Sequence, residues 1–176
     1  MGLWLNIAGY QLVWFAAVYG AATACPWMSV GAALLFVAGQ MLVSRDRSAD
    51  ARALLLAIGL GILIDGSLAA TGLLRYASPH PALGAPAWIL SIWAAFALTV
   101  NHSLAFLRNR PLPAALLGAI GAPLAYSAAA RGFGAVAFAE PRWTGLLALA
   151  VAWAGAMTLF ACAPIHARSA QAGVRR

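Results

Sequence analysis

The sequence predicts an all-α membrane protein, a bundle of six transmembrane helices with both termini in the cytoplasm. Three observations lead to this fold class. Hydrophobic residues make up 64% of the 176 residues and charged residues only 9%, whereas a soluble domain carries about 25% charged residues. The apolar residues come in runs of about twenty, the length that crosses roughly 30 Å of hydrocarbon. Apart from Asp65, the charged residues lie between these runs or after the last of them.

Six apolar runs define the predicted spans in chain order. They are separated by Pro26, the SRDRSADAR loop, the PHPALGAP loop, RNRP and the RGFGAVAFAEPR connection. We place them at residues 3–22, 26–43, 53–74, 86–107, 112–130 and 143–163. At about 1.5 Å per residue each span is roughly 27–33 Å long, enough to cross a membrane with modest tilt. Residues 1–165 are expected to form one domain, followed by a short basic cytoplasmic tail at 166–176.

The arginines set the predicted orientation. On the side of the N-terminus there are eight, at 45, 47, 52, 108, 110, 168, 175 and 176, and on the opposite side three, at 75, 131 and 142. Because arginine and lysine accumulate on the cytoplasmic side, both termini are expected there. This topology also explains the net charge of +7, so no nucleic-acid partner is expected.

Several kinds of chemistry find no support in the sequence. It contains no Gly-rich phosphate loop, paired-histidine metal motif, nucleophile elbow or carboxylate pair, so no cofactor or metal is expected. Cys25 and Cys162 fall on opposite membrane faces, too far apart for a disulfide within one chain. Asp46 and Asp50 are placed in a cytoplasmic loop. Whether the protein is an enzyme is left open.

A layer of polar side chains is predicted near the cytoplasmic boundary. By the rise of a helix, most of its members lie roughly 4–11 Å from that boundary, with Gln11 a little deeper. The candidate ligand-binding residues are Asn6, Gln11, Gln40, Asn101 and Ser103, with His102 as a candidate catalytic residue. Either they form a vestibule for a head group, ion or water, or they hold helices together through hydrogen bonds worth about 0.6–2 kcal/mol each.

Asp65 is the strongest single candidate, as a buried catalytic acid. Counted from the predicted start of its span, it lies about 18 Å deep, close to the midplane, where insertion of an acid costs about 2.5–3.5 kcal/mol. Its helical face carries small residues, Ala57, Gly61, Ala69 and Gly72, so a neighbouring helix can approach closely. Asp65 is expected to face protein, with Gln11 as one partner. It either carries a proton, donates a hydrogen bond to a substrate, or acts as a structural clasp.

The fifth span has a second stripe of small residues, formed by Ala114, Gly118 and Ala122. Pro123 follows and removes the helical donor for the carbonyl of Ala119, so a kink is expected there. That kink either borders a pocket or is an ordinary feature of a membrane helix. In the first span, Trp4 and Trp14 share a face with Gln11, where they either line a cleft or pack in the core.

Four segments carry a resemblance to a known family: WLNIAGYQLVWF, IDGSLAATGLLRY, PAWILSIWAAFALTVNHSLAFL and GAPLAYSAAARGFGAV. Through them the chain resembles the small proteobacterial inner-membrane proteins catalogued as domain-of-unknown-function family 2878. The fourth span is the most specific part, with Pro86, Trp88, Trp93, Phe96, Asn101, His102 and Ser103 at the family's spacing. The fifth departs from it, with Ala122 and Ala129 in place of glycines.

The resemblance implies a multi-pass protein of the bacterial inner membrane and carries over no reaction. Members of the family are often encoded near lipid-modifying enzymes such as cyclopropane fatty acid synthases, which implies membrane lipids and such enzymes as partners. Our hypothesis is therefore lipid modification or lipid handling through a cytoplasm-facing polar pocket with Asp65 below it. The alternatives are a small proton-coupled transporter and a membrane scaffold without a ligand. A homodimer through a small-residue stripe is left open.

Overall fold

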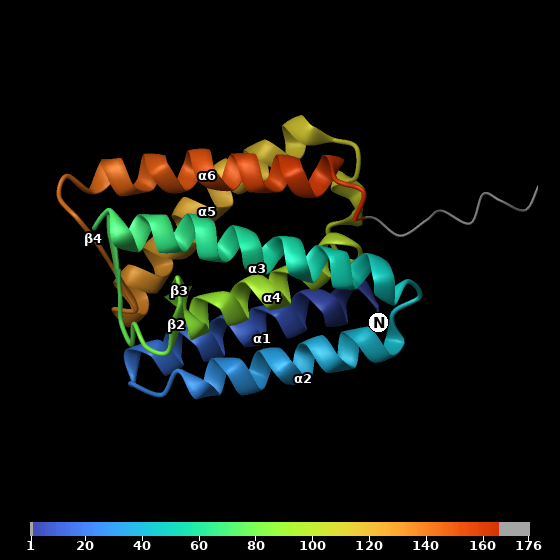
Figure 1. Cartoon of the computed structure of the whole chain (residues 1–176), viewed down its shortest axis with the longest axis horizontal. Coiled ribbons are helices and arrows are strands. Elements are labelled where there is room, and N and C mark those ends of the chain that lie inside the picture. Colours follow the sequence, from blue (N-terminus) through green and yellow to red (C-terminus); the bar gives the residue numbers. More distant parts are fainter. Residues whose placement is uncertain (1, 166–176) are drawn as a thin grey trace, which may run out of the picture.

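The computed structural model describes residues 2–165, and within them it confirms an all-α fold of six helices (Figure 1). These are α1 (Leu3–Ala22), α2 (Trp27–Val43), α3 (Arg47–Ala70), α4 (Ala87–Val100), α5 (Pro111–Phe133) and α6 (Arg142–Cys162). The predicted basic tail, residues 166–176, lies outside the described residues. The helices run back and forth along one axis, so α1 begins and α6 ends at the same end of the bundle.

We call that end the polar end, since it also holds the α2–α3 and α4–α5 connections, and the opposite end the strand end. At the strand end, β1 (Leu74–Tyr76) pairs antiparallel with β4 (Val136–Phe138), and Tyr76 lies opposite Val136. A hairpin of β2 (Ala82–Leu83) and β3 (Ala85–Pro86) precedes α4. The β1–β4 pair ties the α3–α4 connection to the α5–α6 connection.

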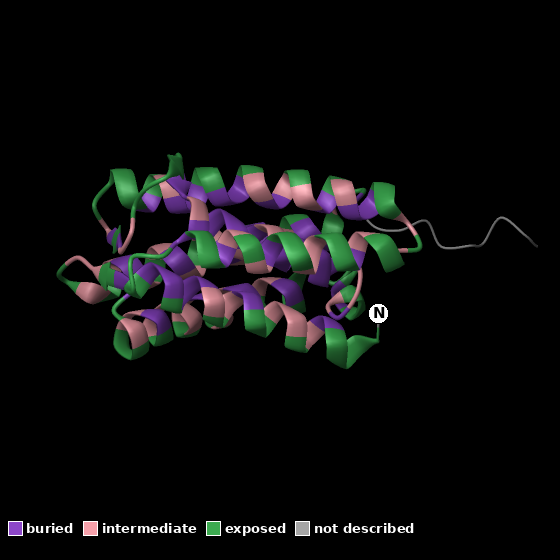
Figure 2. Cartoon of the chain, turned by 90° about the horizontal axis from the view of Figure 1, so that it is seen from below, coloured by how far each residue is buried: buried purple, intermediate pink, exposed green. Residues whose placement is uncertain are grey.

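The central helix is α4, which packs against α1, α2 and α3. It exposes no large apolar side chain, as expected of a helix that is apolar on every face. The other helices expose large apolar side chains, among them Leu12, Leu35, Leu55, Leu124 and Val151. Figure 2 shows that exposed positions follow the outward sides of the helices. By length and composition, α3, α5 and α6 are apolar enough to cross a membrane. A surface of this kind indicates a membrane protein.

The bounds of α3 correct the predicted depth of Asp65. The side chain of Asp46 accepts a hydrogen bond from the amide of Ala49 at 2.9 Å, so the helix begins at Arg47 instead of residue 53. It also ends at Ala70, four residues earlier than predicted. Asp65 is therefore five residues from the end of α3, roughly 8 Å at the rise of a helix, and lies nearer to the strand end than to the middle of α3.

The fourth span was predicted as one helix over 86–107, but α4 ends at Val100. A turn follows, and then the short 3₁₀ helix η1 (Ala105–Leu107). Asn6 of α1 donates from Nδ2 to the carbonyl of Leu98 at 3.0 Å, the acceptor that the amide of His102 would use in a continuing helix. That amide bonds to the carbonyl of Thr99 at 3.0 Å instead. The polar residues 101–103 thus lie in a turn.

The structure confirms the predicted stripe of small residues in α5 but only part of the one in α3. In α5 the predicted stripe faces α6, and a Cβ added to Gly118 would lie 2.3 Å from the carbonyl oxygen of Trp153. In α3 the stripe is shorter than predicted, because Ala69 and Gly72 are exposed and Gly72 lies beyond the helix end with φ +74°. Only its first part, which leads to Asp65, packs against α4.

Candidate functional site

The carboxyl of Asp65 is fully buried and accepts hydrogen bonds from three side chains. Oδ1 accepts from the hydroxyl of Tyr76 at 2.8 Å and from the hydroxyl of Tyr126, and Oδ2 accepts from Nε1 of Trp93 at 2.7 Å. These donors come from β1, α5 and α4 respectively. Gln11, the partner predicted from the sequence, is exposed and makes no contact of this kind.

Two local features place these donors. At Gly61, one turn before Asp65, an added Cβ would lie 2.6 Å from Cδ1 of Trp93, so only glycine leaves room for the indole. Tyr76 is buried on the inner face of β1 and packs edge-on against Trp88 at 6.0 Å between ring centroids. Burial, and next the charge of Asp65, raises the pKa of the Tyr76 hydroxyl above its ordinary value, so this hydroxyl keeps its proton and donates.

Trp93 belongs to an aromatic cluster that fixes its position. It stacks on Trp153 of α6 with ring centroids 4.3 Å apart and 21° between the planes. Phe96 lies edge-on to both indoles, at 6.4 Å and 5.4 Å, and Tyr10 of α1 lies edge-on to Phe96 at 5.9 Å.

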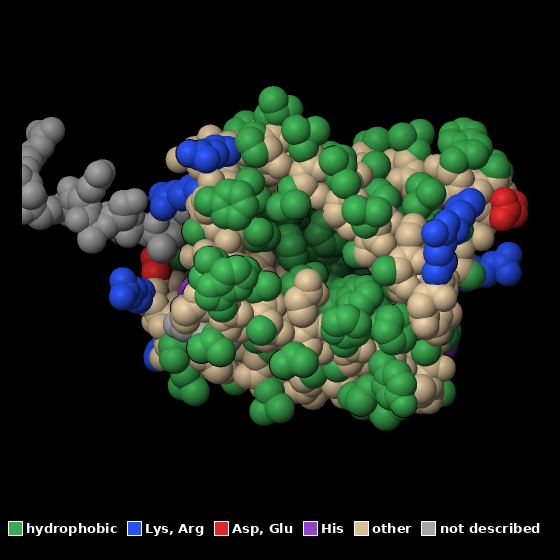
Figure 3. Space-filling view, turned by 180° about the vertical axis from the view of Figure 1, so that it is seen from behind, with side chains coloured by type: hydrophobic (Ala, Val, Ile, Leu, Met, Phe, Trp, Pro, Cys, Tyr) green, Lys and Arg blue, Asp and Glu red, His purple; other side chains and the backbone are tan. Residues whose placement is uncertain are grey.

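Beside this cluster lies a pocket of about 810 Å³, formed between α1, α4, α5 and α6. Trp93 and Tyr126 line it, while Asp65, which holds both, does not. Figure 3 shows it as a hollow surrounded by hydrophobic side chains on the back of the molecule. Every residue that lines it is uncharged, and most are aromatic or aliphatic. The predicted kink region takes part, since Ala122 and Leu124 on either side of Pro123 both line the pocket.

The pocket is elongated along the bundle. Its lining runs from Ile7 to Val18 on α1 and from Leu117 to Ala129 on α5. At the rise of a helix these stretches are roughly 17–18 Å long. One leaflet contributes about half of the roughly 30 Å of hydrocarbon in a bilayer, so the pocket is as long as one leaflet is deep.

A second cluster of polar side chains, at the polar end, centres on Asp50. Asp50 was assigned to a loop, but it lies in the first turn of α3 with 1% of its surface exposed. Oδ2 accepts from Oγ of Ser44 at 2.6 Å and lies 3.0 Å from Nε2 of His102, and Oδ1 accepts from Nδ2 of Asn101 at 3.1 Å. Asn101 also donates to the carbonyl of Ile165 at 3.1 Å.

Helical periodicity contains the signal that was missed. Asp50 precedes Ala57 by seven residues and therefore lies on the same face of α3 as Ala57, Gly61 and Asp65. Asp46, with its side chain ahead of the first turn, is the kind of residue that begins a helix. Together they indicate that α3 starts before Asp50 and that its inner face carries an acid near each end.

The predicted polar layer divides into separate groups. Asn101 and His102 meet at Asp50, whereas Asn6 bonds to Leu98 and accepts from the amide of Ser103 at 3.3 Å. Gln40 is fully buried, and its amide makes no hydrogen bond within residues 2–165. Gln11 and Ser103 both line the pocket.

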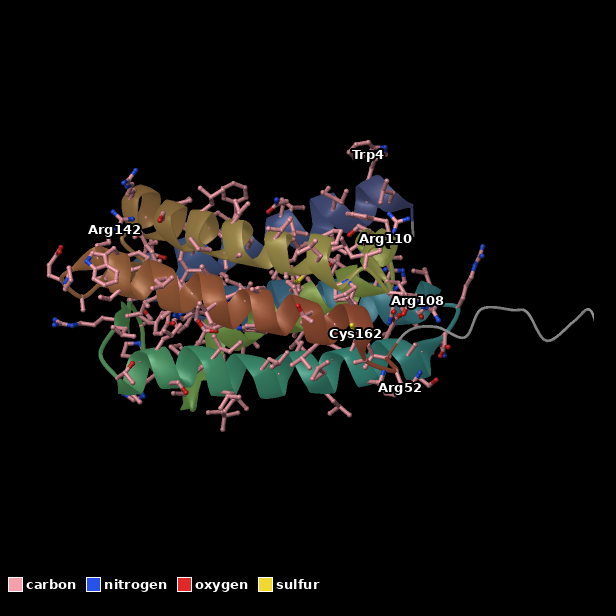
Figure 4. All side chains as sticks on the ribbon, turned by 90° about the horizontal axis from the view of Figure 1, so that it is seen from above. Trp4, Arg52, Arg108, Arg110, Arg142 and Cys162 are labelled. Atoms are coloured by element: carbon pink, nitrogen blue, oxygen red, sulfur yellow. The ribbon has the colours of Figure 1, made fainter. Side chains whose placement is uncertain are left out.

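Trp14 also lines the pocket, whereas Trp4 is 77% exposed and points away from the bundle (Figure 4). Arg52, Arg108 and Arg110 gather at the polar end with Cys162, while Arg142 lies at the other end. Both cysteines are free and exposed. Residues 2–165 contain no group of three or more His, Cys, Asp or Glu side chains that could hold a metal ion.

Comparison with known proteins places the chain in a family without an assigned activity. No curated protein and no solved structure matches it. The profile of one family, described as "Protein of unknown function (DUF2878)", matches residues 3–159, which is nearly the whole chain. The matched part includes Asp50, Asp65 and every residue that lines the pocket. The chain therefore belongs to the DUF2878 family of proteins of unknown function.

Proposed function

We propose that this protein binds the hydrocarbon chain of a membrane lipid in the pocket between α1 and α5, and so handles lipid or presents it to a lipid-modifying enzyme. The observation that carries the proposal is the pocket of about 810 Å³ that opens on an apolar face. Its volume lies within the usual range of ligand sites, roughly 300–1,000 Å³. Its length is that of one leaflet, and a chain entering from the side would not cross water.

The proposal includes a topology. All six helices cross the bacterial inner membrane, with the polar end in the cytoplasm, where Arg45, Arg47, Arg52, Arg108 and Arg110 lie. The α-helix of α4 has only 14 residues, but α1, α2 and α3 surround it, so it need not span lipid alone. Both ends of the described chain lie at the polar end, as an even number of spans requires.

In this proposal Asp65 positions the pocket wall. It binds Trp93 and Tyr126, which line the pocket, and is itself enclosed behind them. Three donors around one carboxyl also suit a scaffold without a ligand. Protein interiors are close-packed, however, and a scaffold has no need of a void of this size. A proton-coupled carrier has less support, because Asp65 is not among the residues that line the pocket.

Photocross-linking in living cells tests the proposal without assuming a lipid class. Cells that express the protein are fed a fatty acid with a diazirine in its chain, so that all their lipids carry the probe. After irradiation, the labelled residues are mapped by mass spectrometry. We expect labels to concentrate on the facing walls of α1 and α5. Uniform labelling over all outward-facing helix surfaces would contradict the proposal.

A matched pair of variants makes this test specific. A Cβ added to Gly121 or to Gly155 meets no atom within 4 Å, but only Gly121 lines the pocket. Gly121→Leu therefore adds a side chain to the pocket wall with no clash at its Cβ, and Gly155→Leu adds the same side chain at an exposed position of α6. We expect Gly121→Leu to reduce pocket labelling several-fold and Gly155→Leu to leave it unchanged.

A further inference from the structure

We propose that the pocket takes an uncharged lipid with a hydroxyl or carbonyl oxygen, such as an acylglycerol or a fatty alcohol, and that Gln11 and Tyr10 of α1 bind this oxygen. The inference rests on the proposed lipid binding and specifies the ligand. It starts from Gln11, which is exposed near the middle of α1. Gln11 lines the pocket.

Within residues 2–165, the side chains of Gln11 and Tyr10 make no hydrogen bond. An amide or hydroxyl that gives up water without gaining a partner costs about 1–3 kcal/mol by protein mutational data. The other α1 side chains that line the pocket are Ile7, Trp14, Phe15 and Val18, and none of them offers an acceptor. A ligand in the pocket is therefore the natural partner of both groups.

The depth of Gln11 restricts what that ligand is. Gln11 lies eight residues from the start of α1, roughly 12 Å at the rise of a helix. The oxygen that it binds thus lies well below the polar end, inside the pocket. The polar part of the ligand must then be small enough to enter with its chain, which favours a lipid with a small polar group over one with a large head group.

The absence of charged residues from the pocket lining restricts the ligand further. None of the residues that line it is Arg, Lys, His, Asp or Glu. A phosphate or an ionised carboxylate drawn to the depth of Gln11 would have no counter-charge, and burying an unpaired ion is far more costly than burying a neutral oxygen. The donors available there, an amide N–H and a phenol O–H, suit a neutral carbonyl or hydroxyl oxygen.

The test uses the full-length protein in vesicles that contain one of two photoactivatable probes with the same diazirine acyl chain. One probe is a monoacylglycerol, and the other is a phosphatidylglycerol that carries this chain. We expect the monoacylglycerol to label the pocket more strongly at equal mole fraction. Gln11→Leu should lower its labelling about three- to tenfold, the loss expected from one hydrogen bond. Tyr10→Phe should lower it in the same direction.

A control variant keeps the composition of the helix. Leu12 is 70% exposed and does not line the pocket, so the double variant Gln11→Leu with Leu12→Gln moves the amide out of the pocket. It should label as weakly as Gln11→Leu alone. Because Gln11 is exposed and bonds to no described residue, these variants should fold normally, as the midpoint of thermal unfolding will show.

Two results would overturn the inference: equal labelling by both probes, or full labelling of Gln11→Leu by the monoacylglycerol. Neither would affect the proposed lipid binding if the cell experiment still places the label in the pocket and Gly121→Leu still removes it. Conversely, a pocket that takes no label in cells would contradict the proposed function itself.

Discussion

Gly61 and Trp93 fit together so closely that the position of the indole depends on the missing side chain. A Cβ on Gly61 would lie 2.6 Å from Cδ1 and 2.8 Å from Cγ of Trp93. The indole is 1% exposed and donates to Asp65 at 2.7 Å. The stripe of small residues in α3 therefore serves a particular purpose, because it brings the indole of α4 within reach of the acid one turn further along α3.

The first prediction concerns this contact. Gly61→Ala should destabilise the protein by about 1–3 kcal/mol, because overpacking a buried contact displaces Trp93 or separates α3 from α4. The midpoint of thermal unfolding in detergent, followed by circular dichroism, measures the loss. Gly59→Ala is the control, since a Cβ at Gly59 meets nothing within 4 Å. It should be neutral or stabilising, and an equal loss in both variants would contradict the explanation.

The second prediction concerns the direction of the hydrogen bonds at Asp65. All three partners donate to it, and Trp93 is unable to accept. An asparagine has only one acceptor oxygen. If, in Asp65→Asn, this oxygen stays on the two tyrosine hydroxyls, the amide nitrogen opposes the N–H of Trp93. If it turns to Trp93, both hydroxyls lose the oxygen to which they donate and must rotate to accept from the amide nitrogen. We expect a loss of about 1–3 kcal/mol, the cost of a buried polar group without a partner. Asparagine is thus not a neutral replacement for this buried acid.

A double-mutant cycle isolates this effect from the loss of the indole itself. In Trp93→Phe the opposing N–H is gone, so adding Asp65→Asn should cost less there than in the natural protein. The expected coupling is at least about 0.5 kcal/mol, measured from unfolding free energies. Strictly additive losses would show that Trp93 is not the donor that the introduced amide opposes.

The third prediction concerns Asp50. Asp50→Leu removes the carboxyl that accepts from Ser44 and Asn101 and lies beside the ring nitrogen of His102, while Asn101 keeps its bond to the carbonyl of Ile165. It should destabilise the polar end by about 1–3 kcal/mol for each donor left buried and unpaired. Asp50→Asn keeps one acceptor oxygen and should cost less. Hydrogen exchange of the turn at 101–104 measures the local effect, and faster exchange is expected in Asp50→Leu.

The exposed Glu140 at the strand end is a suitable control for that experiment. Glu140→Leu removes an acid of the same charge, which among residues 2–165 accepts only from the amide of Arg142, at 3.3 Å. It should leave exchange at 101–104 unchanged. If Asp50→Leu also leaves it unchanged, Asp50 does not hold the turn that ends α4.

The sequence predicted much of the fold, and particular elements show why. The six helices follow from apolar runs, and three small residues at helical spacing indicate the face of α5 that packs closely, although not that α6 is its partner. The bounds of α3 and α4 were wrong where a side chain ends or begins the helix. Asp46 caps α3 within its own turn, which the sequence reveals in hindsight, whereas the partner that ends α4 is Asn6, 92 residues from Leu98.

By itself, then, the sequence determined that the helices suit a membrane, how many helices there are, and which stripes of small residues they carry. It could do so because composition and helical periodicity are properties of residues that are close in the chain. Only the tertiary structure decided which donors surround Asp65, that Asp50 is buried, and that a pocket lies between α1 and α5. These features depend on pairs such as Asp65 and Tyr126, 61 residues apart, or Asp50 and His102, 52 residues apart. Such pairs meet only when helices pack in one arrangement, and no local pattern encodes that arrangement.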